Sequence, residues 1–471
     1  MTLKLLKAPS QNSGYLGKDD MYRRQLLALA ATASAQLISG APKKDMIVRA
    51  ARPEDLEMTL PNFRHAITPI ENFFVRSHHY VPKVELNDWR LAISGQVTTP
   101  ATFTMADLKK MPRVELVSVL ECAGNGRALY QATVPGLQWE YGAVGNGRWA
   151  GVRLADVLRR CGIKQPAIEV LFDGADVPIG KMPEFKRTVP LNKALHPDTI
   201  LAYEMNGEEL PVAHGFPLRL IAPGWAGDSW VKWVTNIEVL DKEFDGFFMK
   251  TAYRHPGKNV SPGSAVDPAK MSPLTSLRIK SVIASHQDGA VVPLGPIKLW
   301  GVAWSGESPL SAVEVSTDNG RSWRPAAVRA SGGKYGWSQW SYEWKPGQEA
   351  YYQVMARARS AAGDSQPFVP EWNPSGYAHN AVPTVGIDVA NTPPASGLKP
   401  ANPALTEPPA EFKSTCMVCH GSDVIEQQRL NRGQWEREVD KMVRWGADVK
   451  PEFRSQLVDF LSNRWGIRPR K

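Results

Sequence analysis

Cysteine, long apolar segments and blocks of one charge are all scarce in this chain of 471 residues. Two of its four cysteines lie in a motif near the C-terminus, which leaves at most one disulfide, between Cys122 and Cys161. The formal net charge is +9, but no long Lys/Arg block is present, which argues against nucleic-acid binding. A mildly basic surface instead suits anionic substrates or an acidic partner.

The segment Cys416-Met-Val-Cys-His420 has the spacing by which c-type haem is attached. Two thiols one helical turn apart can bond to the two vinyl groups of haem, and His420 then faces the iron. Met442 is the one methionine after it and the candidate for the second axial ligand. Histidine and methionine together raise the potential toward electron-transfer use. The motif therefore predicts haem c, bound through Cys416 and Cys419.

A zinc site or a redox pair of thiols is the alternative use of this motif. Zinc needs two further Cys or His side chains nearby, and residues 421–471 contain neither. Haem is therefore favoured, and the protein is expected to mature outside the cytoplasm, where haem c is attached.

The N-terminus also predicts a location outside the cytoplasm. Arg23-Arg24 precedes a weakly apolar run, Leu26–Ile38, with small residues at Ala33-Ser-Ala35. This order predicts a twin-arginine signal peptide over residues 1–41 and a periplasmic protein. The run is too short to span a bilayer, so the mature chain is expected to have no membrane span. An ordinary amphipathic first helix is the alternative, and Met21 is a candidate for the true start.

Residues 45–265 are filled by short apolar runs that Gly and Pro interrupt, with helical stretches such as Val152–Arg160 between them. This texture predicts a mixed α+β domain. The apolar runs include Leu116–Leu120, Glu169–Phe172 and Pro217–Ile221.

The texture changes between residues 270 and 388, where strand-like segments recur at short spacing with turns such as Asp318-Asn-Gly320. Evenly spaced strands of this kind predict an immunoglobulin-like β-sandwich. The segments are Leu277–Ala284, Ile297–Trp304, Ala312–Ser316, Trp337–Trp344 and Tyr352–Ala358.

A Pro-rich linker is predicted at residues 389–411, followed by a small all-α cytochrome c domain at 412–471. Polyproline geometry gives such a linker about 3.1 Å per residue. A long tether lets the haem domain sample several positions at high local concentration. Two amphipathic helices are expected in that domain, at Trp435–Trp445 and Pro451–Trp465.

The apolar strand Leu116–Leu120 leads into Glu121-Cys-Ala-Gly-Asn-Gly-Arg127. A thiol at a strand end, with an arginine five residues later, is a candidate soft-metal ligand in a site that attracts anions. A buried structural cysteine beside a surface arginine is the plain alternative.

The segment Glu121–Arg127 resembles the molybdopterin signature of the sulfite oxidase family, and the resemblance extends over about residues 60–388. Phe73–His78 resembles the family segment that contacts the pterin. The central family block is matched by Leu201–Gly207, His214–Arg219 and Val231–Trp233. The resemblance implies an α+β cofactor domain followed by an immunoglobulin-like dimerisation domain, and hence a homodimer.

The resemblance also implies roles for single residues. Cys122 would be the thiolate ligand of molybdenum, and Arg76 and Arg127 would bind an oxyanion through their charge and planar forks of donors. His78 would sit beside Arg76, and the hydroxyl of Tyr253 would bond the metal-bound oxygen or the substrate. The implied cofactor-binding residues are Phe74, Val75, Arg76, Ser77, His78, Asp176, His214, Arg219, Trp230, Val231 and Lys232.

Two positions depart from the animal members of the family. Gly126 stands where they carry an arginine, and Ser375 where they carry another basic residue. The pocket is therefore predicted to be less basic than theirs and closer to that of bacterial sulfite dehydrogenases. For two residues a purely structural role is the alternative. Tyr253 would then be an aromatic residue at a domain boundary, and His214 a packed residue in a turn.

The implied function is oxidation of sulfite to sulfate at a molybdenum-molybdopterin centre. Electrons would leave through the fused haem to an external cytochrome c. A second hypothesis keeps the fold and makes the substrate sulfane sulfur carried on a partner protein during thiosulfate oxidation. A third is a non-catalytic electron-transfer or redox-sensing module.

Overall fold

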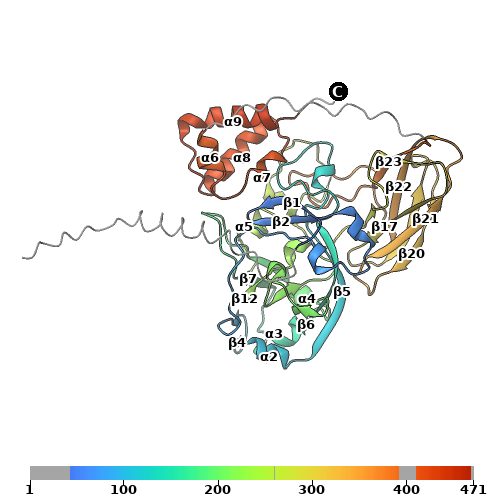
Figure 1. The fold of residues 1–471 in the computed structure, drawn as a ribbon. Helices are drawn as coiled ribbons and strands as arrows, with labels where there is room; N and C mark the ends of the chain where they lie inside the picture. Colours follow the sequence, from blue (N-terminus) through green and yellow to red (C-terminus); the bar gives the residue numbers. More distant parts are fainter. Residues whose placement is uncertain (1–42, 259, 392–409, 468–471) are drawn as a thin grey trace, which may run out of the picture. The chain divides into compact units, whose positions relative to one another are not determined.

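The described part of the chain consists of residues 43–258, 260–391 and 410–467 of a computed structural model (Figure 1). The predicted signal peptide at 1–41 and all but the ends of the predicted linker at 389–411 lie outside these residues. Among the helices that are described, none is both long and apolar enough to cross a membrane.

One sheet of the first domain carries the candidate metal ligand. Its strand order is β10-β9-β6-β5, and β11 also pairs with β9. Strands β5 (Arg113–Glu121) and β6 (Val144–Arg153) pair antiparallel along their length, with Glu121 opposite Val144. The other strands are β9 (Ile200–Met205), β10 (Glu208–Glu209) and β11 (Arg219–Ile221). The sheet thus holds both Cys122, directly after β5, and Arg219, the first residue of β11.

A second sheet of the first domain has the order β4-β3-β12-β7-β8. Strands β3 (Leu91–Gly95) and β12 (Val234–Leu240) are parallel, and the other pairs are antiparallel. The remaining strands are β4 (Ala101–Phe103), β7 (Glu169–Gly174) and β8 (Arg187–Pro190). Sheets of mostly antiparallel strands with short helices between them confirm the predicted α+β domain.

The longest helix of this domain is α3 (Leu154–Cys161), which buries Leu154, Val157, Leu158 and Cys161 against the core. These positions recur at the spacing of one helix face. The helix begins two residues later than predicted, because Val152 still belongs to β6. Cys161 is a buried free thiol in this core, and Cys122 is also free, so the disulfide that the sequence allowed is not formed.

Shorter elements complete the first domain. Two small sheets pair β1 (Met46–Ala51) with β2 (Glu54–Met58) and β13 (Arg254–His255) with β14 (Ser272–Pro273). The short helices are α2 (Met105–Lys109), α4 (Leu191–Ala194) and α5 (Phe247–Lys250). The 3-10 turns are η1 (Leu60–Arg64), η2 (Ile70–Asn72), η3 (Arg127–Leu129), η4 (Val212–His214), η5 (Gly227–Ser229) and η6 (Pro268–Lys270).

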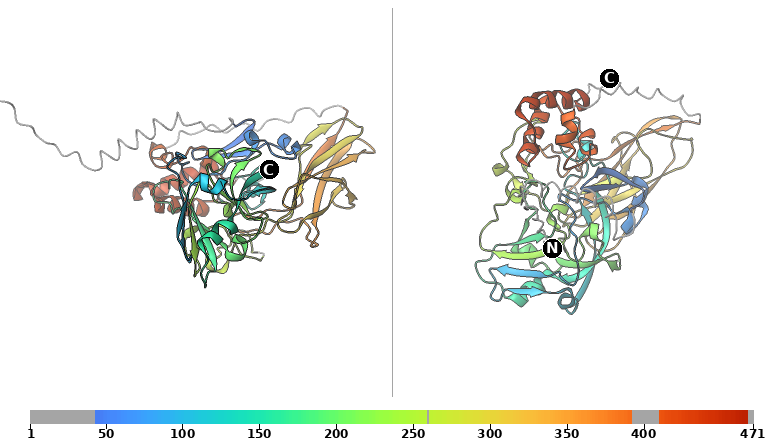
Figure 2. Two further views of the ribbon diagram at one scale, coloured as in Figure 1. Left: turned by 90° about the horizontal axis from the view of Figure 1, so that it is seen from below. Right: turned by 60° about the vertical axis from the view of Figure 1, so that its left-hand side comes forward.

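The second domain is the predicted β-sandwich, made of sheets with orders β15-β17-β21-β20 and β16-β23-β22-β18-β19. Figure 2 shows the strands of this domain in yellow and orange. Alternate residues of the facing strands, such as Leu299, Trp340 and Ala356, share one buried core. Its strands are β15 (Lys280–Ile283), β16 (Ala290–Val292), β17 (Ile297–Trp304), β18 (Leu310–Ser316), β19 (Arg324–Pro325), β20 (Ala327–Ala330), β21 (Ser338–Trp344), β22 (Ala350–Ser360) and β23 (Thr384–Val389).

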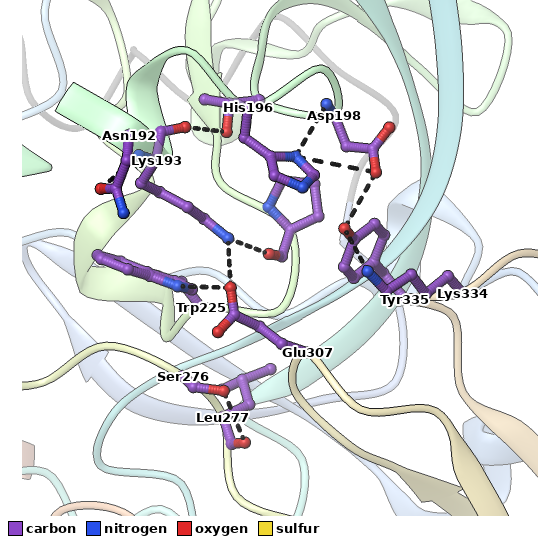
Figure 3. Close-up of polar contacts among 12 residues, drawn as sticks. Asn192, Lys193, His196, Asp198, Trp225, Ser276, Leu277, Glu307, Lys334 and Tyr335 are labelled. Carbon is purple, nitrogen blue, oxygen red and sulfur yellow. Dashed lines mark hydrogen bonds and ion pairs between the residues drawn. The ribbon is translucent and has the colours of Figure 1, made fainter. Parts of the chain in front are cut away.

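A buried lysine joins the two domains (Figure 3). Nζ of Lys193, in α4, donates to the carbonyl of Pro223 at 2.9 Å and to Oε1 of Glu307 at 3.1 Å. Nε1 of Trp225 donates to the same oxygen at 3.2 Å. Glu307 lies between β17 and β18, so these bonds fix the sandwich against the first domain.

The last part of the chain is all α-helical. Helix α8 (Arg432–Arg444) begins three residues before the predicted start, because Asn431 and Gln434 form a capping box there. Helix α9 (Pro451–Trp465) has the predicted bounds, with proline at its first position. The other helices are α6 (Ala410–Cys416) and α7 (Asp423–Glu426). We call residues 410–467 the C-terminal domain; its core contains Phe412, Leu430, Trp435, Val439, Val458 and Leu461.

Candidate active site

Cys122 is presented at the end of β5 by a tight turn. Its backbone N–H donates to the carbonyl of Ala143 at 2.9 Å, which continues the pairing of β5 with β6 by one residue. A Cβ on Gly124 would lie 2.6 Å from the guanidinium of Arg127, so a larger residue there would force that side chain to move. Gly126 has φ of 92°, a left-handed conformation that favours glycine. Gly126 therefore has a role in the backbone geometry of this turn.

One carboxylate fixes this turn to the second domain. Glu121 accepts hydrogen bonds from Nδ2 of Asn125 at 2.9 Å, Nζ of Lys280 at 2.9 Å and Nε1 of Trp304 at 2.8 Å. Glu121 and Lys280 are buried, with side chains 8% and 3% exposed. A buried charge that is paired and fully hydrogen-bonded holds its surroundings in place. The position of Cys122 therefore depends on both domains, which the sequence motif alone did not indicate.

Two arginines reach the cavity that Cys122 lines. Nη1 of Arg76 forms an ion pair with Asp55 at 3.2 Å and also donates to the carbonyl of Ser77. Burial works against the charged form of Arg76, but Asp55 raises its pKa, so the guanidinium stays charged. Arg127 donates through Nε to the carbonyl of Ser375 at 2.9 Å and through Nη1 to that of Leu137 at 2.8 Å. Both side chains are thus held in fixed orientations.

Tyr253 and His78 form a close pair in the same cavity. The hydroxyl of Tyr253 lies 2.5 Å from Nε2 of His78, and the His78 ring stacks on Phe185 at 4.4 Å between centroids. Burial raises the pKa of Tyr253 well above its usual value and lowers that of His78 well below it. Both groups are therefore uncharged at neutral pH. Tyr253 has φ of 56°, a strained backbone that the surrounding structure maintains.

A buried cluster of basic side chains lies in a second cavity that Cys122 also lines: the cations Arg219 and Lys232, with His214 beside them, whose pKa burial lowers well below its usual value. Nζ of Lys43 is 2.8 Å from Nε2 of His214, behind this lining. Burial lowers the pKa of Lys232 to about 7 and that of Arg219 to about 9. Several buried cations with lowered pKa values indicate a place for a bound anion.

Most of the other predicted cofactor residues line this second cavity as well. They are Phe74, Val75, Arg76, Ser77, His78, Asp176 and Trp230. Burial raises the pKa of Asp176 to about 6. Val231 is different, because its side chain is buried in the hydrophobic core and is not among the cavity-lining residues.

The donor set of the second cavity fits a molybdopterin. Arg219 Nε and Asp228 Oδ1, on two lining residues, are buried without a hydrogen-bond partner among the described residues. Such atoms carry a cost unless a bound group satisfies them. The cations suit the phosphate of the cofactor, and the thiol of Cys122 lines both cavities, as a shared metal ligand would.

The haem motif lies at the far side of the first cavity, which measures about 510 Å³. Cys416, Cys419, His420 and Met442 all line it. Nδ1 of His420 is 2.9 Å from the carbonyl of Gly421, which orients the ring and leaves Nε2 for a metal. Trp435 also lines the cavity, and its buried Nε1 has no partner within the described chain. These residues fit a covalently attached haem with an N–H donor for one of its carboxylates.

The fold and this site define an oxidoreductase that binds its metal through an organic cofactor. Comparison with known families agrees. Residues 78–248 match the family described as "Oxidoreductase molybdopterin binding domain", and residues 272–390 match "Mo-co oxidoreductase dimerisation domain".

Comparison with individual proteins identifies the family more closely. The chain is 36% identical over 346 residues to mitochondrial sulfite oxidase of Drosophila melanogaster, covering 68% of this chain and 59% of that one. It is 33% identical over 333 residues to sulfite oxidase of Gallus gallus, covering 67% of this chain and 72% of that one. This protein belongs to the sulfite oxidase family.

A solved structure shares the architecture. The sulfane dehydrogenase SoxCD from Paracoccus pantotrophus superimposes with a TM-score of 0.62 at 26% identity, covering 76% of this chain and 89% of that one. The chain is thus similar to proteins whose names refer to different sulfur substrates.

Proposed function

We propose that this protein oxidises sulfite to sulfate at a molybdenum-molybdopterin centre bound by Cys122. The observation that carries the proposal is that Arg76 and Arg127 line the same cavity as Cys122. Guanidinium groups match the charge and the planar oxygen pairs of a small oxyanion. One sulfite and one water yield one sulfate, two protons and two electrons. The molybdenum cofactor, when bound, supplies the oxygen-atom transfer and takes up the electron pair.

The side chains around Cys122 have separate tasks in this proposal. Arg76 and Arg127 bind the oxyanion and offset its charge, the kind of electrostatic stabilisation that usually dominates catalysis. Ionised Asp55 keeps Arg76 charged and in position. The uncharged pair Tyr253 and His78 offers a hydrogen bond beside the anion without repelling it.

We propose that the electrons leave singly through haem c on Cys416 and Cys419, with His420 and Met442 as axial ligands, to an external cytochrome c. In support, these four residues and Cys122 line one cavity. A haem held by these residues would supply one-electron transfer beside the substrate pocket.

We also propose the setting in which the protein works. A haem attached through two thiols requires maturation outside the cytoplasm, and the twin arginines at Arg23-Arg24 suit export of a folded, cofactor-loaded protein. The match of residues 272–390 to a dimerisation domain supports a homodimer.

A second candidate is oxidation of sulfane sulfur bound to a carrier protein. The likeness to the sulfane dehydrogenase SoxCD favours it. Both candidates need the same molybdenum ligand, and they differ in the space that the substrate requires at the mouth of the pocket.

The test is optical. The purified protein, oxidised and without oxygen, is mixed with sulfite while the absorption bands of reduced haem are followed. Rapid reduction is expected in the wild type, and none in Cys122→Ser, which should retain its haem. A protein shown to contain both molybdenum and haem, yet not reduced by sulfite, would overturn the proposal and favour carrier-bound sulfur.

A further inference from the structure

A fully buried ion pair joins the two larger sheets of the first domain. Nη2 of Arg187 lies 2.5 Å from Oδ2 of Asp228, and both side chains are 1% exposed. Arg187 is the first residue of β8 in the second sheet, whereas Asp228 lies in η5, which follows β11 of the first sheet. The sulfite chemistry proposed above does not use this pair.

The pair is not complete by itself. A buried ion pair contributes little stability compared with apolar side chains of the same volume. Moreover, Nε of Arg187 and Oδ1 of Asp228 are both buried without a hydrogen-bond partner among the described residues. Of the two residues, Asp228 lines the second cavity. An unsatisfied buried oxygen on a cavity wall indicates that the bound group supplies a hydrogen-bond donor.

The backbone fixes Asp228 close to the cysteine turn. A Cβ on Gly227 would lie 2.9 Å from the carbonyl oxygen of Glu121, so η5 packs directly against the end of β5. The N–H of Trp230 donates to the carbonyl of Gly227 at 3.1 Å and closes the turn. Asp228 and Cys122 therefore line the second cavity together.

The second cavity thus presents charged groups of both signs. Arg219 and Lys232 suit the phosphate of a molybdopterin. Burial raises the pKa of Asp228 to about 6 and Arg187 opposes that rise, so the carboxylate is mainly ionised at neutral pH. An ionised carboxylate accepts hydrogen bonds and cannot donate them. The pterin part of a molybdopterin carries N–H groups, which are the donors that such an oxygen needs.

We propose that Asp228 is a further binding residue for the cofactor, with Oδ1 accepting a hydrogen bond from an N–H of molybdopterin and Arg187 holding the carboxylate in place. The inference rests on the proposed function and deepens it. The segments that resemble the family, His214–Arg219 and Val231–Trp233, lie on either side of Asp228 and do not contain it. The resemblance therefore gave no sign of this contact.

Support of Tyr253 is the structural alternative for the same pair. Nη1 of Arg187 donates to the carbonyl of Phe248 in α5. The guanidinium carbon of Arg187 also lies 5.4 Å from the centroid of the Tyr253 ring. If this were the whole role of the pair, its loss would slow turnover and leave cofactor binding unchanged, so cofactor retention separates the two roles.

The experiment uses the full-length protein loaded with molybdopterin and haem. Asp228→Asn keeps the volume of the side chain but exchanges one acceptor oxygen for a donor NH2 group. Arg187→Met/Asp228→Leu replaces the whole pair by apolar side chains and leaves no unpaired charge buried. The matched control is Lys186→Met/Asp173→Leu, a neighbouring pair 3.1 Å apart whose side chains are 29% and 25% exposed and line neither cavity.

The measurement is the release of pterin during dialysis, followed by the fluorescence of its oxidised form. Metal analysis gives the molybdenum content, absorbance gives the haem content, and denaturant unfolding shows whether each variant is folded. The wild type and the control are expected to release pterin at the same slow rate. Asp228→Asn and the apolar pair should release it about tenfold faster or more, because one hydrogen bond to a charged group is lost, while their haem content stays unchanged.

Pterin release as slow as in the wild type, in Asp228→Asn or in the folded apolar pair, would overturn the contact and assign the ion pair to the support of Tyr253 alone. If the apolar pair does not fold, Asp228→Asn decides by itself. Because pterin release requires no sulfite, a wild type that does not oxidise sulfite would overturn the proposed function, while the release rates still decide the role of Asp228.

Discussion

The ring of Tyr377 stacks on the ring of Tyr253, with centroids 5.2 Å apart and planes 14° from parallel. Tyr253 belongs to the first domain, whereas Tyr377 follows β22 in the second. The guanidinium carbon of Arg127 lies 5.5 Å from the centroid of the Tyr377 ring. The N–H of Ala378 donates to the carbonyl of Ala123 at 2.9 Å and fixes this segment beside the cysteine turn. The second domain therefore supplies part of the pocket wall.

Replacing Tyr377 tests this wall. In Tyr377→Ala, Arg127 loses a ring face and Tyr253 loses its stacking partner, contacts that together contribute about 1–2 kcal/mol. KM for sulfite is expected to rise about tenfold, with a smaller change in kcat. Tyr377→Phe keeps both ring contacts and should stay close to the wild type. Steady-state kinetics on all three proteins decides, and equal KM values in all three would remove Tyr377 from the pocket.

The buried pair of Lys280 and Glu121 predicts a stability effect. Lys280→Met leaves the carboxylate of Glu121 buried without its cation, which is expected to cost about 3–5 kcal/mol of folding free energy. Lys298→Met, at an exposed position of β17, is the control and should change little. Adding Glu121→Gln to the Lys280→Met variant should restore part of the loss, because a neutral amide tolerates burial better. Denaturant unfolding measures all four proteins, and no recovery in the double variant would contradict the charge argument.

Lys43 predicts an effect on cofactor retention. Its Nζ donates to the carbonyls of Ile70 and Phe73 at 2.7 and 2.8 Å and contacts Nε2 of His214 at 2.8 Å. Lys43→Met should free the His214 ring and lower the molybdenum content of the purified protein, while the haem content stays unchanged. Lys44→Met, with an exposed side chain, is the matched control. Metal analysis gives the molybdenum content and absorbance gives the haem content. An unchanged molybdenum content in Lys43→Met would contradict the role of Lys43 in retaining the cofactor.

His379 predicts a pH dependence of stability. The ring is 6% exposed, packs edge-on against Tyr130 and has a buried Nδ1 with no partner among the described residues. Burial, with a contribution from Lys280, lowers its pKa to about 3. The unfolded histidine binds a proton near pH 6.5, so the unfolded state binds more protons below that value. Stability should therefore fall as the pH decreases from about 6.5 toward 3.

Thermal unfolding as a function of pH tests this sign. His379→Asn should give a shallower decline over the acid range, by about one proton. His196→Asn, at a side chain 37% exposed, serves as the control. A decline that is equally steep in His379→Asn and the wild type would assign the acid sensitivity to other groups.

Elements with a local pattern were predictable from the sequence. Helix α9 has its predicted bounds because Pro451 marks the start and the amphipathic spacing continues to Trp465. Strand β17 coincides with Ile297–Trp304, since turn residues limit it on both sides. The start of α8 was misplaced because its capping residues, Asn431 and Gln434, are polar and lie outside the apolar pattern.

Site residues could likewise be predicted where they belong to a local motif. The haem motif is a short segment whose spacing carries the chemistry, and Cys122 and Arg127 belong to a short segment that resembles a family motif. Asp55, Lys43 and Tyr377 were missed, because each reaches the site from a distant part of the chain and has no motif around it. The extended tether suggested a mobile C-terminal domain, whereas Gln427 and Gln428 of that domain form hydrogen bonds with the first domain.

The sequence by itself determined which chemical groups this protein carries: a candidate molybdenum thiolate, anion-binding arginines and a haem attachment motif. Spacing within one short segment is enough for the haem motif, and the resemblance of other short segments to a family motif implies the thiolate and the arginines. The tertiary structure alone decided that Lys280 holds Glu121, that Tyr377 completes the pocket and that Gln427 and Gln428 bind the first domain. Those contacts join residues more than a hundred positions apart, and only the packing of whole domains brings them within hydrogen-bonding distance.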